Sequence, residues 1–154
     1  MRLQNIEESS RWYPGAGLYR PVTLIETGRT AIAQWGVNVQ TLSIDADGTV
    51  SARFTAETEN YTGRDLALEF DVQTESRHRT VFSSGIGADG TCSVIETFGC
   101  VVPWSPEEPR LYNLTVSLYD VADGKKTLLD SVTKRVGYRT VKCSAERGFE
   151  LNGV

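Results

Sequence analysis

From residue 37 onward, short runs of the chain alternate apolar with polar side chains. Over residues 50–57, Val50, Ala52, Phe54 and Ala56 alternate with polar residues. Successive side chains of a β-strand point to opposite faces of a sheet, so a period of two predicts a strand with one buried face. Comparable strand-like runs lie at 36–43, 66–73, 79–82, 91–97, 111–120 and 127–141.

Turn-forming residues separate these runs. The tripeptide Ala-Asp-Gly occurs at 46–48, 88–90 and 122–124, each time between two strand-like runs. Its glycine supplies the positive φ of a tight hairpin, so each copy predicts a hairpin turn. No stretch of ten or more residues shows the apolar period and the caps of a helix. The sequence therefore predicts an all-β fold, an immunoglobulin-like antiparallel β-sandwich of about seven strands.

The two ends of the chain depart from this pattern. Residues 15–27 predict a turn followed by a single strand, 22–26, that has no hairpin partner of its own. The last six residues include the apolar Phe149 and Leu151. Because a complete domain seldom ends in this way, we expect both ends to belong to a larger protein.

Charge and hydropathy argue against two classes of partner. The chain has 16 Lys and Arg against 20 Asp and Glu, a net charge of −4. Basic residues form no cluster, so we expect no nucleic-acid partner. The first ten residues are polar and charged with no apolar run behind them, which predicts neither a secretory signal nor a membrane span. The cellular compartment stays open.

The three cysteines, Cys92, Cys100 and Cys143, are too few for a disulfide scaffold. Free thiols are the expected state of all three. A Cys92–Cys100 bridge is the alternative, because a short hairpin could bring both sulfur atoms into range.

Motifs that could carry chemistry fail on their surroundings. GIGADG at 85–90 fits a phosphate-binding glycine pattern, but strand-like residues follow it where a helix must begin, so a glycine-rich hairpin loop is predicted. DADG at 45–48 starts like a calcium loop, yet Phe54 stands at the position of the bidentate glutamate. His78 is the only histidine, and no two carboxylates stand out as an acid and a nucleophile. We therefore predict no catalytic residue, no cofactor and no metal site.

Aromatic residues give the best functional signal that does not depend on a known family. Trp12, Tyr13 and Tyr19 cluster near the N-terminus, and Trp104 lies in the proline-rich run VVPWSPEEPRLYNLTV at 101–116. Exposed aromatic faces can stack on sugar rings, whereas a Trp-Tyr-Pro-Gly cluster more often buries a domain junction. We favour the junction, and we expect Trp104 to pack over one end of the sandwich.

Three segments together resemble family 2 of the glycoside hydrolases, the group of β-galactosidases, β-glucuronidases and β-mannosidases. RWYPGAGLYRPVTL at 11–24 resembles the segment that closes the family's N-terminal jelly-roll domain. VPWSPEEPRLYNLTVSLYD at 102–120 resembles a stretch of the immunoglobulin-like second domain. VGYRTVKCSAERGFELNG at 136–153 resembles the last strand of that domain and the lead into the catalytic (β/α)₈ barrel.

The resemblance implies a division of the chain into three parts. Residues 1–28 are the tail of the preceding sugar-binding jelly-roll, 29–142 are the immunoglobulin-like β-sandwich, and 143–154 are the linker into a barrel that this chain lacks. The family's two catalytic glutamates lie in that barrel, so the resemblance implies no catalytic residue here and no enzyme activity for the chain as given. It implies a retaining, β-galactosidase-like parent protein. The partners of this chain are then the neighbouring domains of that parent, and the chain contacts carbohydrate only as part of the parent.

Two other functions stay open at this stage. The chain could be a stand-alone carbohydrate-binding module that uses Trp12, Tyr13 and Trp104 as stacking platforms. It could also be a structural or adhesion sandwich that binds another protein through its apolar ends. Titration with sugars and gel filtration separate these alternatives from the domain hypothesis.

Overall fold

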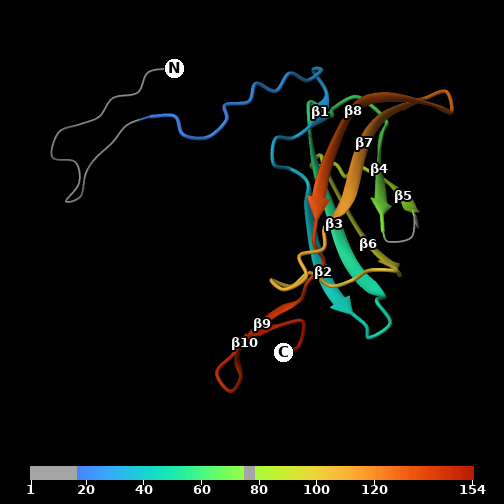
Figure 1. Ribbon diagram of the computed structural model, residues 1–154. Coiled ribbons are helices and arrows are strands. Elements are labelled where there is room, and N and C mark those ends of the chain that lie inside the picture. Colours follow the sequence, from blue (N-terminus) through green and yellow to red (C-terminus); the bar gives the residue numbers. More distant parts are fainter. Residues whose placement is uncertain (1–16, 75–78) are drawn as a thin grey trace.

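The computed structural model describes residues 17–74 and 79–154, in which all regular structure is β (Figure 1). Within these residues there is no helix that is long and apolar enough to cross a membrane. The ten strands are β1 (Ala31–Ile32), β2 (Asn38–Ile44), β3 (Val50–Glu59), β4 (Leu66–Gln73), β5 (Arg79–Gly85), β6 (Thr91–Phe98), β7 (Tyr112–Ala122), β8 (Lys125–Val136), β9 (Val141–Ser144) and β10 (Gly148–Leu151).

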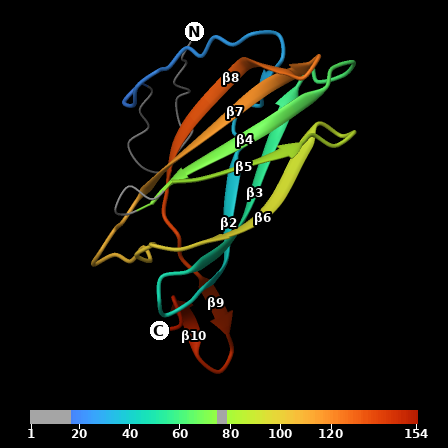
Figure 2. The same ribbon diagram turned by 90° about the vertical axis from the view of Figure 1, so that its right-hand side faces the viewer.

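Eight of the strands form two packed antiparallel sheets (Figure 2). In one sheet β3 pairs with β6 along one edge and with β1 and β2 along the other. In the other sheet the strand order is β5-β4-β7-β8. The prediction of an all-β, immunoglobulin-like sandwich is confirmed, with the two-residue β1 as an addition to the expected seven strands. The last two strands, β9 and β10, form a separate hairpin below the sandwich.

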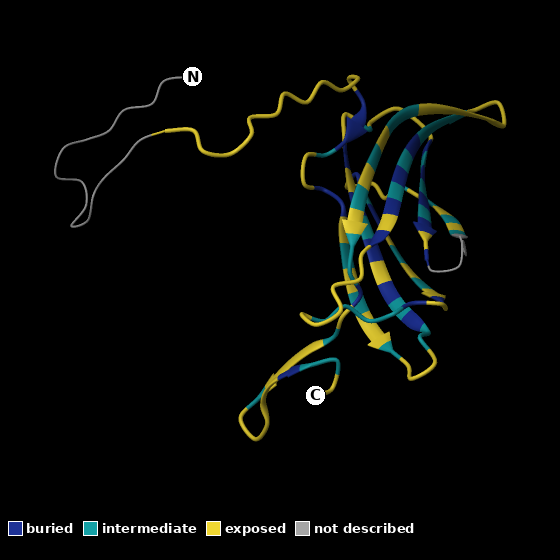
Figure 3. Cartoon of the chain, in the orientation of Figure 1, coloured by how far each residue is buried: buried dark blue, intermediate teal, exposed yellow. Residues whose placement is uncertain are grey.

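The alternating positions of the sequence form the core between the two sheets (Figure 3). Every second residue is buried in β3, in β4 and over residues 112–118 of β7, and Phe54 of one sheet packs against Phe70 of the other, with ring centroids 5.9 Å apart. Phe82 lies 5.0 Å from Phe54 and 5.2 Å from Phe70. Full burial of a large apolar side chain stabilises a fold by roughly 1.5–3 kcal/mol, so this aromatic cluster is a main source of stability.

On the side of β3 opposite β6, the pairing is interrupted between β1 and β2. Ile32 pairs with Thr58 and Asn38 pairs with Thr55. Five residues, 33–37, therefore lie opposite only two residues of β3, 56 and 57, and three residues must leave the ladder. They form an outward loop closed by the Gly36 amide, which donates to the Ala33 carbonyl at 2.9 Å.

Two sequence predictions about local structure are wrong. Residues 22–26 do not form a strand, because no strand of the described residues lies beside them to complete a ladder, and they are exposed. The GIGADG loop is not a hairpin, since it joins β5 of one sheet to β6 of the other. The Ala-Asp-Gly tripeptides at 46–48 and 122–124 do form hairpin turns, between β2 and β3 and between β7 and β8.

The cysteines are all free thiols, so the alternative of a Cys92–Cys100 bridge is wrong. Cys92 is buried in the core from β6, whereas Cys100 is exposed beyond the end of that strand with a left-handed φ of 61°. His78 lies outside the described residues. Among the described residues, no three potential ligand side chains come together in a way that could hold a metal ion.

Candidate functional site

The segment between β6 and β7 crosses the end of the sandwich from which the β9–β10 hairpin projects (Figures 1 and 2). We call this region the junction, comprising residues 99–111 and 137–154. Pro103, Pro106 and Pro109 lie in the first part, and proline cannot donate to a strand ladder. The segment is therefore fixed by side-chain contacts and by a few backbone bonds of its own.

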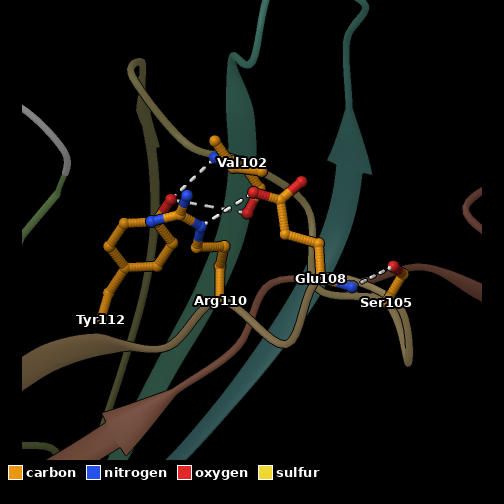
Figure 4. A network of polar contacts seen from close by, with 5 residues as sticks. All are labelled: Val102, Ser105, Glu108, Arg110 and Tyr112. Carbon is orange, nitrogen blue, oxygen red and sulfur yellow. Dashed lines mark hydrogen bonds and ion pairs between the residues drawn. The ribbon is translucent and has the colours of Figure 1, made fainter.

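Side chains within residues 102–112 fix the path of this segment (Figure 4). The Tyr112 hydroxyl accepts a hydrogen bond from the Val102 amide at 2.7 Å. The Ser105 hydroxyl accepts one from the Glu108 amide at 3.0 Å, and the Glu108 carboxylate accepts one from Arg110 Nε at 2.9 Å. Tyr112 is buried at the start of β7, so the segment is tied directly to the core.

The turn between β2 and β3 supports the same segment from below. The Val101 amide donates to the Gly48 carbonyl at 3.2 Å. Gly48 has a φ of 81°, and a Cβ atom there would lie 2.7 Å from the Val101 carbonyl oxygen. Only glycine fits this position, both for its left-handed backbone and for the close approach.

Trp104 lies in the crossing segment and contacts Gly137, Tyr138 and Arg139, the residues that follow β8. Its amide donates to the Tyr138 carbonyl at 2.8 Å, and the Arg139 guanidinium lies 4.6 Å from the centre of its ring. A Cβ atom added at Gly137 would lie 3.0 Å from Cδ1 of the indole. The half-buried ring is thus covered by Arg139 on one face, in a cation–π contact.

Asn152 joins the hairpin to the rest of the junction. Its amide donates to the Thr140 carbonyl at 2.9 Å, and its side-chain oxygen accepts from the Thr140 amide at 3.0 Å. Its side-chain nitrogen donates to the Trp104 carbonyl at 3.0 Å. Asn152 has a φ of 54°, a conformation that asparagine tolerates better than most residues. One side chain therefore binds the end of β10, the start of β9 and the crossing segment together.

The hairpin itself exposes apolar side chains beyond this attachment. Phe149 is paired with Cys143 across the hairpin and is 67% exposed, and Val141 is also exposed. Glu150 is buried and forms an ion pair with Arg147 at 3.2 Å. The hairpin is thus fixed at its base and open along one apolar face.

Perturbed pKa values occur in turns and in the core. A hydrogen bond from the Thr49 amide lowers the pKa of Asp47, and a hydrogen bond from the Thr91 hydroxyl lowers that of Asp89. Burial, together with the nearby Tyr112, raises the pKa of the Tyr138 hydroxyl. The carboxylates of Asp47 and Asp89 stabilise turns and lie on different loops, which is not the arrangement of a catalytic acid and nucleophile.

The structure places the predicted aromatic residues in different surroundings. Tyr19 is 86% exposed in the N-terminal segment, with Arg20 over its ring at 5.2 Å. That segment leads away from the sandwich at the end opposite the β9–β10 hairpin (Figure 1). Trp12 and Tyr13 lie outside the described residues. The proposed roles of all four in a domain junction or in sugar stacking remain predictions.

Sequence reasoning missed three residues that the structure brings forward. Trp35 lies in the loop between β1 and β2, Arg139 covers Trp104, and Asn152 fixes the hairpin. Local signals existed for two of them, because a glycine directly follows Trp35 and Asn152 begins an Asn-Gly pair. The pairing of Arg139 with Trp104 joins residues distant in sequence and leaves no local signal.

Comparison with known proteins gives matches along nearly the whole chain. Beta-galactosidase BoGH2A of Bacteroides ovatus is 31% identical over 160 residues, which is 99% of this chain and 18% of that protein. A putative beta-glucuronidase of Formosa agariphila is 32% identical over 157 residues, 99% of this chain and 14% of that protein. The chain therefore spans less than a fifth of the length of these relatives.

Solved structures agree on the fold. A beta-glycosidase from Bacteroides vulgatus superposes with a TM-score of 0.68 at 24% identity, covering 93% of this chain and 18% of that one. A Bacteroides uniformis beta-glucuronidase superposes with a TM-score of 0.59 at 19% identity, covering 82% of this chain and 16% of that one. The family model for glycosyl hydrolases family 2 matches residues 29–139, more than half of the chain. The chain belongs to family 2 of the glycosyl hydrolases.

Proposed function

We propose that this chain is a non-catalytic immunoglobulin-like domain of a larger family 2 glycoside hydrolase, in which it braces a preceding sugar-binding domain against a following (β/α)₈ barrel. The observation that carries the proposal is that the two ends of the sandwich differ. One end leaves an extended apolar segment exposed, and the other fixes the direction in which the chain departs. The match to less than a fifth of each relative supports the same interpretation.

The N-terminal segment carries large apolar side chains of the kind that protein interfaces bury, but here they are exposed. Five large apolar side chains within residues 18–25 are between 57% and 93% exposed: Leu18, Tyr19, Val22, Leu24 and Ile25. A contiguous exposed apolar surface marks an interaction site in a folded protein. A preceding domain that covers residues 18–25 would bury these side chains, and Val22 and Leu24 have the alternation that a strand in its sheet would require.

The C-terminal junction is suited to transmit orientation. Asn152 binds both sides of the hairpin base and the crossing segment, so the last described residues leave the sandwich in one direction. The exposed Phe149 on the same hairpin supplies an apolar contact for whatever follows. A stiff exit of this kind holds two neighbours at a set angle, which a flexible linker cannot do.

The parent activity is proposed to be that of a retaining β-glycosidase of the β-galactosidase-like branch. A relative named as a beta-galactosidase and another named as a putative beta-glucuronidase support this class. Retaining hydrolysis needs two carboxyl groups about 5–5.5 Å apart across the glycosidic bond. We assign that pair to the barrel of the parent and none of it to this chain.

The stand-alone carbohydrate-binding alternative has less support from the geometry. A stacking platform presents an open aromatic face to a sugar ring. One face of Trp104 is covered by the Arg139 guanidinium, and its backbone and neighbours fix it in the junction. Trp104 therefore has the surroundings of a structural anchor.

Hydrolysis assays test the proposal directly. The 154-residue chain and the full-length polypeptide of its reading frame are assayed on nitrophenyl β-galactoside, β-glucuronide and β-mannoside. We expect no turnover above the blank for the chain, and turnover of at least one substrate by the full-length protein. Hydrolysis by the isolated chain would contradict the proposal, and so would a reading frame that encodes no barrel.

A further inference from the structure

A groove of about 370 Å³ lies beside the N-terminal segment, away from the junction. Residues 25–27 form one wall, and the loop between β1 and β2 with the middle of β8 forms the rest. Its apolar lining includes Ile25, Ile32, Trp35, Val37 and Val132. We call it the Trp35 groove.

Trp35 combines a strained backbone conformation with an exposed aromatic side chain, and an isolated domain favours neither. It has a φ of 64° and is 82% exposed. Left-handed backbone is uncommon for residues other than glycine, asparagine and aspartate, and a bulky side chain there is an outlier. Such strained residues persist where surrounding structure enforces them, and they cluster at binding sites. Here the three extra residues opposite β3 enforce the loop.

Two of the charged side chains that line the groove, those of Asp130 and Lys134, are engaged in holding that loop. The Asp130 carboxylate accepts hydrogen bonds from the Ile32 amide at 2.9 Å and from the Ser131 amide at 2.8 Å. The Lys134 ammonium donates to the Val37 carbonyl at 3.5 Å and lies 5.8 Å from the centre of the Trp35 ring. A sugar needs convergent polar groups in addition to an aromatic face, whereas an apolar side chain needs only the surface that remains. The groove therefore fits an apolar protein side chain better than a sugar.

The size of the groove selects a tethered partner. Stable association of two separate proteins buries about 1,600 Å² in total, far more than a single groove of this volume supplies. A partner joined to the same chain has an effective concentration in the millimolar range, so a small contact is sufficient to hold it. Ile25 itself belongs to the segment that leads into the sandwich from the N-terminal side.

We propose that the Trp35 groove receives an apolar side chain of the domain that precedes this sandwich in the parent protein. This contact rests on the function proposed above and adds to it a named anchor. The exposed segment 18–25 and the groove then lie on one continuous surface, which Ile25 joins, and Trp35 has the role of a buried aromatic anchor in an interface.

The test compares Trp35→Ala with Ile95→Ala, an equally simple truncation of an exposed apolar residue on β6. Each variant is made in the full-length protein and in the 154-residue chain. Limited proteolysis within residues 17–30 should be about tenfold faster or more for full-length Trp35→Ala than for the full-length wild type, as expected for loss of an interface anchor. Cleavage should not accelerate in the isolated chain, nor for Ile95→Ala in either protein.

Other results would overturn the proposal. Equal acceleration of Trp35→Ala cleavage in both proteins shows a local structural role, and no acceleration in either shows no contact. Quenching of the chain's tryptophan fluorescence by β-galactosides or β-glucuronides, lost in Trp35→Ala, makes the groove a sugar site. A concentration-dependent dimer in gel filtration, lost in the same variant, makes it a self-association site. A silent variant in a full-length protein that hydrolyses its substrate overturns the groove contact and leaves the proposed function standing.

Discussion

The two ends of this domain treat their aromatic and apolar side chains differently. At the C-terminal junction, Trp104 lies under Arg139, and Asn152 satisfies its hydrogen bonds with groups of the same chain. At the N-terminal end, Leu24 and Trp35 are open to solvent, although the loop that carries Trp35 is closed by the hydrogen bond from the Gly36 amide to the Ala33 carbonyl. The contacts around Trp104 and Asn152 are thus made within the domain, although Phe149 of the same hairpin stays exposed, whereas the N-terminal surface is proposed to be covered by a neighbouring domain. Substitutions in the isolated chain should therefore be costly at the junction and nearly silent at the N-terminal end.

The largest contrast is expected between two glycines. Gly48→Ala should lower the free energy of unfolding by about 2–4 kcal/mol, because alanine disfavours the left-handed backbone and its Cβ would meet the Val101 carbonyl. Gly28→Ala should change it by less than about 0.5 kcal/mol, since the nearest atom to its Cβ is 3.8 Å away. Urea denaturation of both variants measures the difference. Equal costs at the two positions would contradict the comparison.

The second contrast concerns the hairpin attachment. Asn152→Ala removes two side-chain hydrogen bonds and strains a left-handed backbone, so local opening of the hairpin should become easier by about 2 kcal/mol. Hydrogen exchange of the Thr140 amide should then be roughly 30-fold faster. Asn152→Gly keeps the backbone but loses the side chain, and it should fall between the wild type and Asn152→Ala. Unchanged exchange at Thr140 would show that other contacts hold the hairpin.

Alkaline pH should lower the stability of the fold through the buried Tyr138. The folded pKa of Tyr138 is raised above its ordinary value of 10, so the folded state holds the proton more tightly than the unfolded state. The stability contribution of the neutral hydroxyl is present below pH 10 and is lost as the pH rises above it, by about 1.4 kcal/mol per pH unit. Denaturation between pH 10 and 11 should show a shallower loss for Tyr138→Phe than for the wild type.

Two neighbouring tyrosines, Tyr112 at the start of β7 and Tyr138 in the junction, should respond oppositely to loss of the hydroxyl at neutral pH. Tyr112→Phe leaves the Val102 amide without its acceptor and should cost about 1–1.5 kcal/mol. The buried Tyr138 hydroxyl has no hydrogen-bond partner among the described residues, so Tyr138→Phe should be neutral or stabilising by up to about 1 kcal/mol. Denaturant midpoints of the two variants provide the measurement. A cost for Tyr138→Phe comparable to that for Tyr112→Phe would show that Tyr138 does have a partner.

The smallest effect is expected in the N-terminal segment. Leu24→Ser in the isolated chain should change the free energy of unfolding by less than about 0.5 kcal/mol, because Leu24 is 93% exposed. Thermal denaturation measures the change in both proteins. In the full-length protein Leu24→Ser should clearly lower the stability, since there the side chain is proposed to be covered. A decrease in the isolated chain would mean that the segment packs on its own sandwich.

The sequence predicted those parts of the fold in which burial acts on one face of one strand. The period of two in β3, β4 and β7 follows directly from a sheet with one side in the core, so their strands and buried residues were predictable. The GIGADG loop was misjudged because local turn chemistry is the same whether the next strand joins the same sheet or the opposite one. Residues 22–26 have strand propensity, but a strand also needs a neighbour that the local sequence does not reveal.

The candidate site was less predictable than the fold for a related reason. Trp104 could be placed near an end of the sandwich, because the prolines around it exclude a central strand. Its cover by Arg139 and the attachment through Asn152 depend on contacts across 35 and 48 residues of sequence. The Trp35 loop depends on how β1 and β2 align against β3, and no local pattern records that alignment.

The hydrogen bond between the Ile32 amide and the Asp130 carboxylate has a consequence for the order of folding during synthesis. These residues are 98 positions apart. At a synthesis rate of ~5–20 residues per second, β1 waits about 5–20 s after its own synthesis before Asp130 exists to bind it. The preceding domain that we propose would have completed its chain well before that moment. The groove beside Trp35, which includes residues 130–132 and 134, is therefore completed only after that domain has been synthesised.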